Sequence, residues 1–165
     1  MKANETPSKH EVALVGANSR ILGDVLGQLL KHEIAVNAMV TFPEKIRLDN
    51  SLLTVSHLDA TDFKATKEAL DAYPVVILAY NDDLEDKATN ELTLKTFAKT
   101  VQAATEAHVK RLIVVGSENS EAFFVSDLKR NDKIDWLFIS NVGPYAKRVR
   151  REILEPTRHR TVYQD

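Results

Sequence analysis

Apolar residues fall into six short, nearly continuous runs, and the segments between these runs carry apolar residues at every third or fourth position. Short continuous runs are typical of strands covered on both faces, whereas the wider spacing is typical of amphipathic helices. We predict strands over residues 11–15, 35–40, 52–56, 74–79, 111–115 and 135–139. We predict helices over residues 21–31, 61–72, 84–108, 120–131 and 144–154, and a short helical turn over 44–48.

The alternation of strands and helices predicts an α/β fold, a doubly wound parallel sheet in a Rossmann-like three-layer sandwich. Right-handed crossovers favour the strand order 3-2-1-4-5-6. The link between the second and third strands is too short for a full crossover helix, so its structure is the weakest part of this prediction. Helical spacing and strand position predict a set of buried residues: Ile21, Val25, Leu26, Leu29, Leu30, Leu92, Phe97, Val101, Ala104 and Trp136.

Composition narrows the class of protein. The 165 residues are interpreted as one domain over residues 11–165, after a disordered amino-terminal segment over residues 1–10. A net charge of −2 gives no overall attraction to nucleic acid or membrane. The absence of cysteine excludes disulfides, thiol nucleophiles and thiolate metal sites. Neither a signal peptide nor a membrane-spanning run is visible, so we expect a cytoplasmic protein.

Residues 12–23, with the sequence VALVGANSRILG, are typical of a buried strand that leads through a glycine turn into a helix. Dinucleotide-binding folds hold pyrophosphate at such a corner, where the fingerprint is G-x-G-x-x-G. Here Gly16 opens the turn, while Ser19 and Leu22 occupy the positions of the second and third glycines. The segment predicts a dinucleotide loop, and a turn that only connects strand and helix is the alternative.

Six segments, of which the loop just described is the first, follow in the order of one family's motifs. Residues 16–22 correspond to GATGxxG, 41–45 to an arginine followed by N-P-E-K, 58–62 to G-D-x-x-D, 74–81 to DAVISALG, 109–117 to VKRLIVVSS and 134–141 to LDWTIVRP. On these residues the chain resembles the atypical short-chain dehydrogenases that include the NmrA-like and NAD(P)H-binding, flavin-reductase-like proteins. The resemblance runs from about residue 12 to residue 140.

The resemblance implies an NAD(P) cofactor, with loss of the cofactor as the alternative. Thr41 replaces the family's arginine for the 2′-phosphate, and no carboxylate at that strand end binds the ribose. Arg20 and Lys45 favour NADP over NAD, because a cation can bind the 2′-phosphate. The alternative is that both are solvated surface side chains. Asp59 either contacts the adenine region or caps the next helix. The expected cofactor contacts are Gly16, Ala17, Asn18, Ser19, Arg20, Ile21, Leu22, Thr41, Lys45, Asp59, Ala60, Ala79, Tyr80 and Asn81.

The usual catalytic pair of short-chain dehydrogenases, Tyr-x-x-x-Lys, does not occur in the chain. Lys129 falls on the corresponding helix, but Val125 stands four residues before it. Tyr145 is followed by Val149 at the same spacing. Ser117 matches the family's serine at the end of the fifth strand and is the single catalytic candidate, without a tyrosine partner.

Metal and nucleic-acid binding are not expected. The acidic run of residues 82–86 is explained by the dipole of the helix that it begins, and the five histidines lack ligand spacing. The tail from residue 144 has an excess of cations, but it lacks aromatic interleaving and any nucleic-acid motif, so a solvated helix is expected. The expected partners are a dinucleotide and an unidentified small-molecule acceptor, and homo-oligomerisation stays open.

Three functions remain open. The first is an oxidoreductase that passes hydride from NAD(P)H to a flavin-like or quinone-like acceptor, which tolerates the missing tyrosine and lysine because the cofactor carries the chemistry. The second is a non-catalytic, NmrA-like dinucleotide sensor or regulator. The third is an interaction scaffold that has lost the ligand, since fold alone does not imply function.

Overall fold

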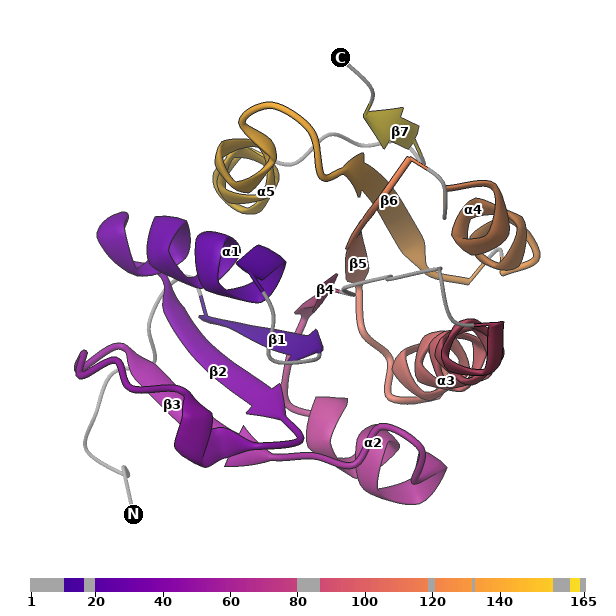
Figure 1. The fold of residues 1–165 in the computed structure, drawn as a ribbon, viewed down its shortest axis with the longest axis horizontal. Coiled ribbons are helices and arrows are strands. Elements are labelled where there is room, and N and C mark those ends of the chain that lie inside the picture. The colour runs from indigo at the N-terminus through magenta and orange to yellow at the C-terminus, as the bar shows by residue number, and fades with distance from the viewer. Residues whose placement is uncertain are drawn as a thin grey trace.

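A computed structural model describes residues 11–16, 20–79, 87–118, 121–131, 133–155 and 161–163. These residues form one sheet of seven parallel strands in the order β3-β2-β1-β4-β5-β6-β7 (Figure 1). The strands are β1 (Glu11–Gly16), β2 (Ala35–Val40), β3 (Leu53–His57), β4 (Val75–Ala79), β5 (Arg111–Gly116), β6 (Asp135–Ser140) and β7 (Thr161–Tyr163).

Helices cover both faces of the sheet, which gives the three layers seen in Figure 1. One face carries α1 (Arg20–Lys31) and α5 (Tyr145–Leu154), and the other carries α2 (Phe63–Leu70), α3 (Lys87–Glu106) and α4 (Glu121–Lys129). The link from β2 to β3 contains only the short 3-10 helix η1 (Pro43–Lys45). The face beside α1 therefore lacks a full-length helix between these two strands.

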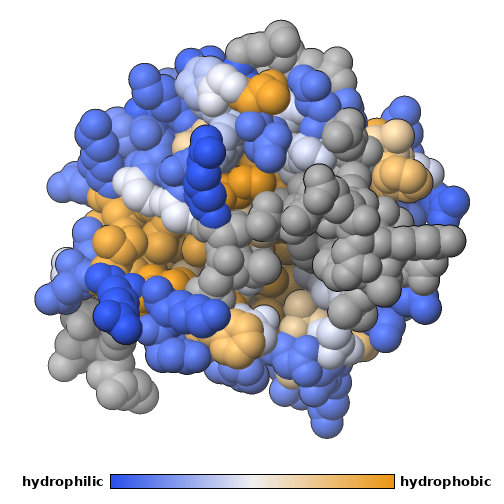
Figure 2. Space-filling model, in the orientation of Figure 1, coloured by the Kyte–Doolittle hydropathy of each residue, from blue (hydrophilic) through white to orange (hydrophobic). Residues whose placement is uncertain are grey.

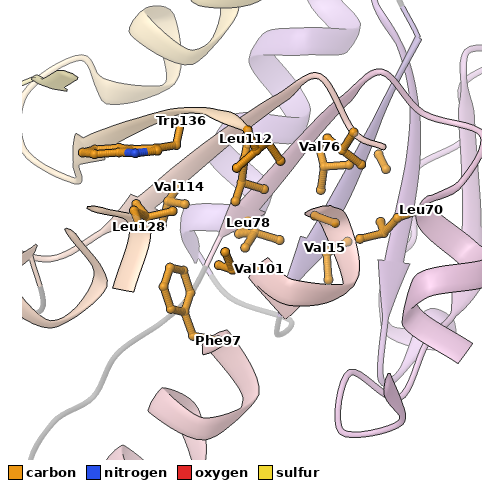
Figure 3. Packing of buried hydrophobic residues seen from close by; sticks show 14 of the residues in the cluster. Val15, Leu70, Val76, Leu78, Phe97, Val101, Leu112, Val114, Leu128 and Trp136 are labelled. Carbon is orange, nitrogen blue, oxygen red and sulfur yellow. The ribbon is translucent and has the colours of Figure 1, made fainter. Parts of the chain in front are cut away.

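Two apolar clusters lie on the two faces of the sheet. Alternate residues of β1 contribute to different clusters: Ala13 and Val15 face the α2–α3–α4 side, and Val12 and Leu14 face the α1–α5 side. This alternation explains why a strand covered on both faces reads as a continuous apolar run. Figure 3 shows the α2–α3–α4 cluster from close by, with side chains from the sheet, α2, α3 and α4 packed together.

The predicted α/β class and the order of the first six strands are confirmed. Every residue predicted to be buried that falls among the described side chains is buried, including Phe97, Val101 and Trp136; Leu92 lies outside them. Asp62 is the cap of α2, because its side chain accepts a hydrogen bond from the Ala65 N–H at 3.0 Å.

Two structural features differ from the prediction. A seventh strand, β7, joins the outer edge of β6. Its three residues are too few to form a recognisable apolar run. The helical turn predicted over 44–48 is the shorter η1, which begins at Pro43 and ends at Lys45. Proline is favoured at the first helical position, because it has no N–H to leave unsatisfied there.

Candidate functional site

The carboxyl ends of the parallel strands lie at one edge of the sheet, and the chain order changes direction between β1 and β4. Gly16, the last residue of β1, aligns with Val40 of β2 on one side and with Ala79 of β4 on the other. In open α/β sheets, ligands bind outside the carboxyl ends of the strands at such a switch point. The start of α1 adds N–H groups that favour anions at the same place.

Gly16 is a glycine for a reason that sequence reasoning did not supply. A Cβ built at this position would lie 2.1 Å from the carbonyl oxygen of Ala79. The neighbouring strand β4 thus excludes any side chain at position 16, whether or not a ligand is bound. Ala17, Asn18 and Ser19, which complete the predicted turn, lie outside the described residues.

The bulky residues of the loop pack into the core. Ile21 and Leu22 are buried and belong to the apolar cluster beneath α1. Leu22, the departure from the family's third glycine, is only 3% exposed. The fold therefore accommodates this leucine by packing it with Val25, Leu26 and its other neighbours in the cluster.

Three cations gather beside this corner. Arg20, Lys45 and Arg47 line a pocket of about 440 Å³ between α1 and the segment that follows β2. We call it the basic pocket; its other lining residues are Leu22, Gly23, Leu26, Ile46 and Leu48. The structure thus brings Arg20 and Lys45, which the sequence singled out separately, to one site together with Arg47.

The cations of the basic pocket differ in what holds them. The Arg20 side chain is 90% exposed, and its Nε lies 3.7 Å from Asp24 Oδ2. The Lys45 ammonium lies 4.7 Å from the centre of the Phe42 ring, a cation–π contact. Thr41, at the end of β2, is exposed and uncharged.

Asp59 takes part in a local turn. Its Oδ1 accepts hydrogen bonds from the hydroxyl and the N–H of Thr61, and these bonds hold the pKa of the Asp59 carboxyl below its usual value. It does not cap α2, since Asp62 does. Asp59 is exposed and Ala60 half-buried, while Ala79 is fully buried in the sheet. Tyr80 and Asn81 lie outside the described residues.

The expected position of the catalytic tyrosine is closed. Val125 is 7% exposed and packs in the α2–α3–α4 cluster, while Lys129, the last residue of α4, is exposed. Ser117 is half-buried just beyond the end of β5. The described residues of this edge therefore hold a serine but no tyrosine–lysine pair.

A link between α1 and α5 was missed by sequence reasoning. The Tyr145 hydroxyl donates a hydrogen bond to Asp24 Oδ2, the same oxygen that lies near Arg20. Asp24 and Tyr145 are 121 positions apart, so no local pattern could have paired them. Arg148 donates to the Val142 carbonyl at 3.1 Å and so holds the loop that leads from β6 to α5.

Asp24→Asn is expected to lower the pKa of Tyr145. Burial and the hydrogen bond to the Asp24 carboxylate raise this pKa to about 12. Because the folded value lies above the unfolded value of about 10, the hydroxyl contributes stability that is present below pH of about 10 and is lost as the pH rises through the folded value. Carbon-13 NMR of labelled tyrosine rings measures the titration. An unchanged Tyr145 titration in Asp24→Asn would contradict the pairing.

The described part of the chain contains neither a membrane-spanning helix nor a cluster of metal ligands. None of its helices is long and apolar enough to cross a membrane. No group of three or more histidine, aspartate or glutamate residues there could hold a metal ion. The acidic run of residues 82–86 lies outside the described residues.

Comparison with solved structures supports the fold. A proposed epimerase from Bacteroides thetaiotaomicron is 21% identical, with a TM-score of 0.79 over 93% of this chain and 94% of that one. A Rossmann-fold NAD(P)-binding family protein from Shigella flexneri is 20% identical, with a TM-score of 0.70 over 91% and 89%. The NADPH-dependent quinone oxidoreductase of Escherichia coli, solved with NADPH, is 18% identical, with a TM-score of 0.72 over 93% and 68%.

No protein with a curated description matches the chain. The sequence model of the NAD(P)H-binding family matches residues 16–155, which run from the last residue of β1 to just beyond α5. This match includes the β1–α1 corner, the basic pocket and the carboxyl ends of β4, β5 and β6. The chain therefore belongs to the NAD(P)H-binding family.

Proposed function

We propose that the chain binds NADP(H) in preference to NAD(H), along the carboxyl edge of the sheet. The observation that carries the preference is the grouping of Arg20, Lys45 and Arg47 beside the β1–α1 corner. A 2′-phosphate at the rim of the basic pocket would meet Arg20 and Lys45. Charge-assisted hydrogen bonds from such cations to phosphate are among the strongest in proteins.

The residues present fit this cofactor. Leu22 packs in the core, so the leucine that replaces a glycine is accommodated beneath α1. Thr41 is neutral, so no carboxylate at the end of β2 opposes a 2′-phosphate, and none is available there for the ribose hydroxyl of NAD. The Nε of Arg20 is directed to Asp24, which leaves its two terminal nitrogens for an anion.

For the reaction, we propose hydride transfer from NAD(P)H to a flavin-like or quinone-like acceptor. The reduced nicotinamide, when bound, supplies the hydride, and a quinone takes this hydride with one proton from water to become a hydroquinone. The part of this chain is to bind, orient and shield the reactants, which needs no tyrosine–lysine pair. Ser117, at the end of β5, is the candidate to donate a hydrogen bond to the acceptor.

A non-catalytic dinucleotide sensor is the second candidate. The buried Val125 favours it, because the catalytic position of the family is occupied by a core residue. The two functions share the cofactor and differ in turnover. Absorbance at the nicotinamide band, with added flavin or quinone, separates them: loss of the band indicates the oxidoreductase, and a constant trace with several acceptors indicates the sensor.

Arg20→Ala is expected to weaken NADPH binding about tenfold, the loss of about 1.4 kcal/mol, because one charged partner of the 2′-phosphate is removed. NADH binding should change less than twofold, since NADH lacks that phosphate. Isothermal titration calorimetry measures both affinities. Lys31→Ala, at the other end of α1, is the control and should change neither. Equal losses for the two cofactors would reject this role for Arg20.

A further inference from the structure

Half of the residues that line the basic pocket are apolar, and a 2′-phosphate bound by its cations does not explain them. Leu22, Leu26, Ile46 and Leu48 line the pocket together with the three cations. We propose that the basic pocket binds an amphiphilic anion, a ligand with an apolar body and one carboxylate, sulfonate or phosphate group. This inference goes beyond dinucleotide binding, because it rests on Gly23 and on the apolar residues Leu26, Ile46 and Leu48, which the dinucleotide proposal does not use.

The pocket exists because the β2–β3 link is short. A full crossover helix on this face would lie beside α1, but the three residues of η1 are followed directly by Ile46, Arg47 and Leu48. Ile46 packs against the apolar cluster beneath α1, whereas Leu48 is 53% exposed. Figure 2 shows the corresponding apolar area on the face where α1 lies in Figure 1, bordered by hydrophilic residues.

Size and charge select the kind of ligand. Small-molecule sites are about 300–1,000 Å³ and combine apolar walls with a few polar groups; the basic pocket has about 440 Å³ and four apolar lining residues. Among the residues that the structure describes, the charged ones that line it are Arg20, Lys45 and Arg47, and none is acidic. An apolar ligand with one negative charge complements this lining, whereas a cationic ligand of the same shape does not.

Gly23 lines the basic pocket without a side chain. No atom of the described residues lies within 4 Å of a Cβ built at Gly23, and the same is true one turn later at Gly27. Only Gly23 lines the basic pocket. A larger side chain at position 23 would therefore extend into the pocket without a clash at its base, and the same side chain at position 27 serves as the matched control.

The experiment measures binding of anilinonaphthalene sulfonate, an apolar fluorescent anion, to the full chain. Wild-type protein should bind the dye at one site, decanoate should displace it, and decyltrimethylammonium should not. Gly23→Leu should weaken dye binding at least tenfold, while Gly27→Leu should leave it within twofold of wild type. Arg47→Gln should weaken binding about fivefold and leave the melting temperature unchanged, because Arg47 is exposed.

Both glycine variants should melt at or above the wild-type temperature, because leucine is a better helix former than glycine. Melting scans thus show that any loss of binding is not a loss of folding. Equal dye binding by Gly23→Leu and Gly27→Leu, or equal displacement by decanoate and decyltrimethylammonium, would overturn the proposal. Calorimetry with NADPH on the same wild-type protein tests the dinucleotide proposal separately, so failure of one leaves the other standing.

Discussion

Replacing Glu152 by glutamine is expected to lower the free energy of unfolding by about 3–5 kcal/mol, because it removes the negatively charged partner of a buried ion pair. Glu152 Oε2 lies 2.8 Å from Arg111 Nη2, and the two side chains are 1% and 10% exposed. The pair joins α5 to the first residue of β5. Denaturant unfolding measures the change, which should appear as a lower midpoint.

The double variant Arg111→Met with Glu152→Leu is the informative control for this result. Replacement of a whole buried ion pair by apolar residues is often neutral or stabilising, so the double variant should be more stable than Glu152→Gln alone. A loss below about 1 kcal/mol for Glu152→Gln, the range of exposed ion pairs, would contradict a buried pair at this position.

Gly16→Ala is expected to destabilise the protein by about 3 kcal/mol, the upper end of the range for overpacking. The added Cβ would lie 2.1 Å from the Ala79 carbonyl oxygen, a backbone atom of the paired strand, so β1 and β4 would have to separate locally. Chemical denaturation gives the size of the loss, and dinucleotide binding should weaken as the β1–α1 corner moves.

Gly23→Ala and Gly27→Ala are the controls for Gly16→Ala. Both sites lie in α1 with nothing within 4 Å of an added Cβ, so each alanine should stabilise the protein by up to about 1 kcal/mol through helix propensity. Opposite signs for Gly16 and for the two helical glycines are therefore expected. If Gly16→Ala leaves the free energy of unfolding unchanged, β1 and β4 tolerate a side chain at this position and the prediction is wrong.

The fold could be predicted because its main features are local. Strands such as β5 (Arg111–Gly116) form continuous, largely apolar runs, and α1 has apolar residues at every third or fourth position. Both patterns are visible in the sequence. β7 could not be predicted, because its placement depends on pairing with β6 rather than on a pattern of its own. The short η1 could be anticipated only as an unusually brief link.

The site was less predictable because its contacts join distant residues. Arg20 and Lys45 could be nominated by motif position, but their grouping with Arg47 around one pocket depends on how the β2–β3 link lies against α1. The Asp24–Tyr145 bond and the Arg111–Glu152 pair carry no sequence signature. The requirement for glycine at position 16 comes from the Ala79 carbonyl in another strand.

The central claim is that this chain binds a nicotinamide dinucleotide, and the most direct test is its melting temperature as a function of NADPH concentration. A ligand that binds only the folded state stabilises it by RT ln(1 + [L]/Kd), about 2.7 kcal/mol at a hundred times Kd. We expect a rise that grows with the logarithm of NADPH concentration and is smaller for NADH. A melting temperature unchanged by millimolar NADPH and NADH would contradict the account.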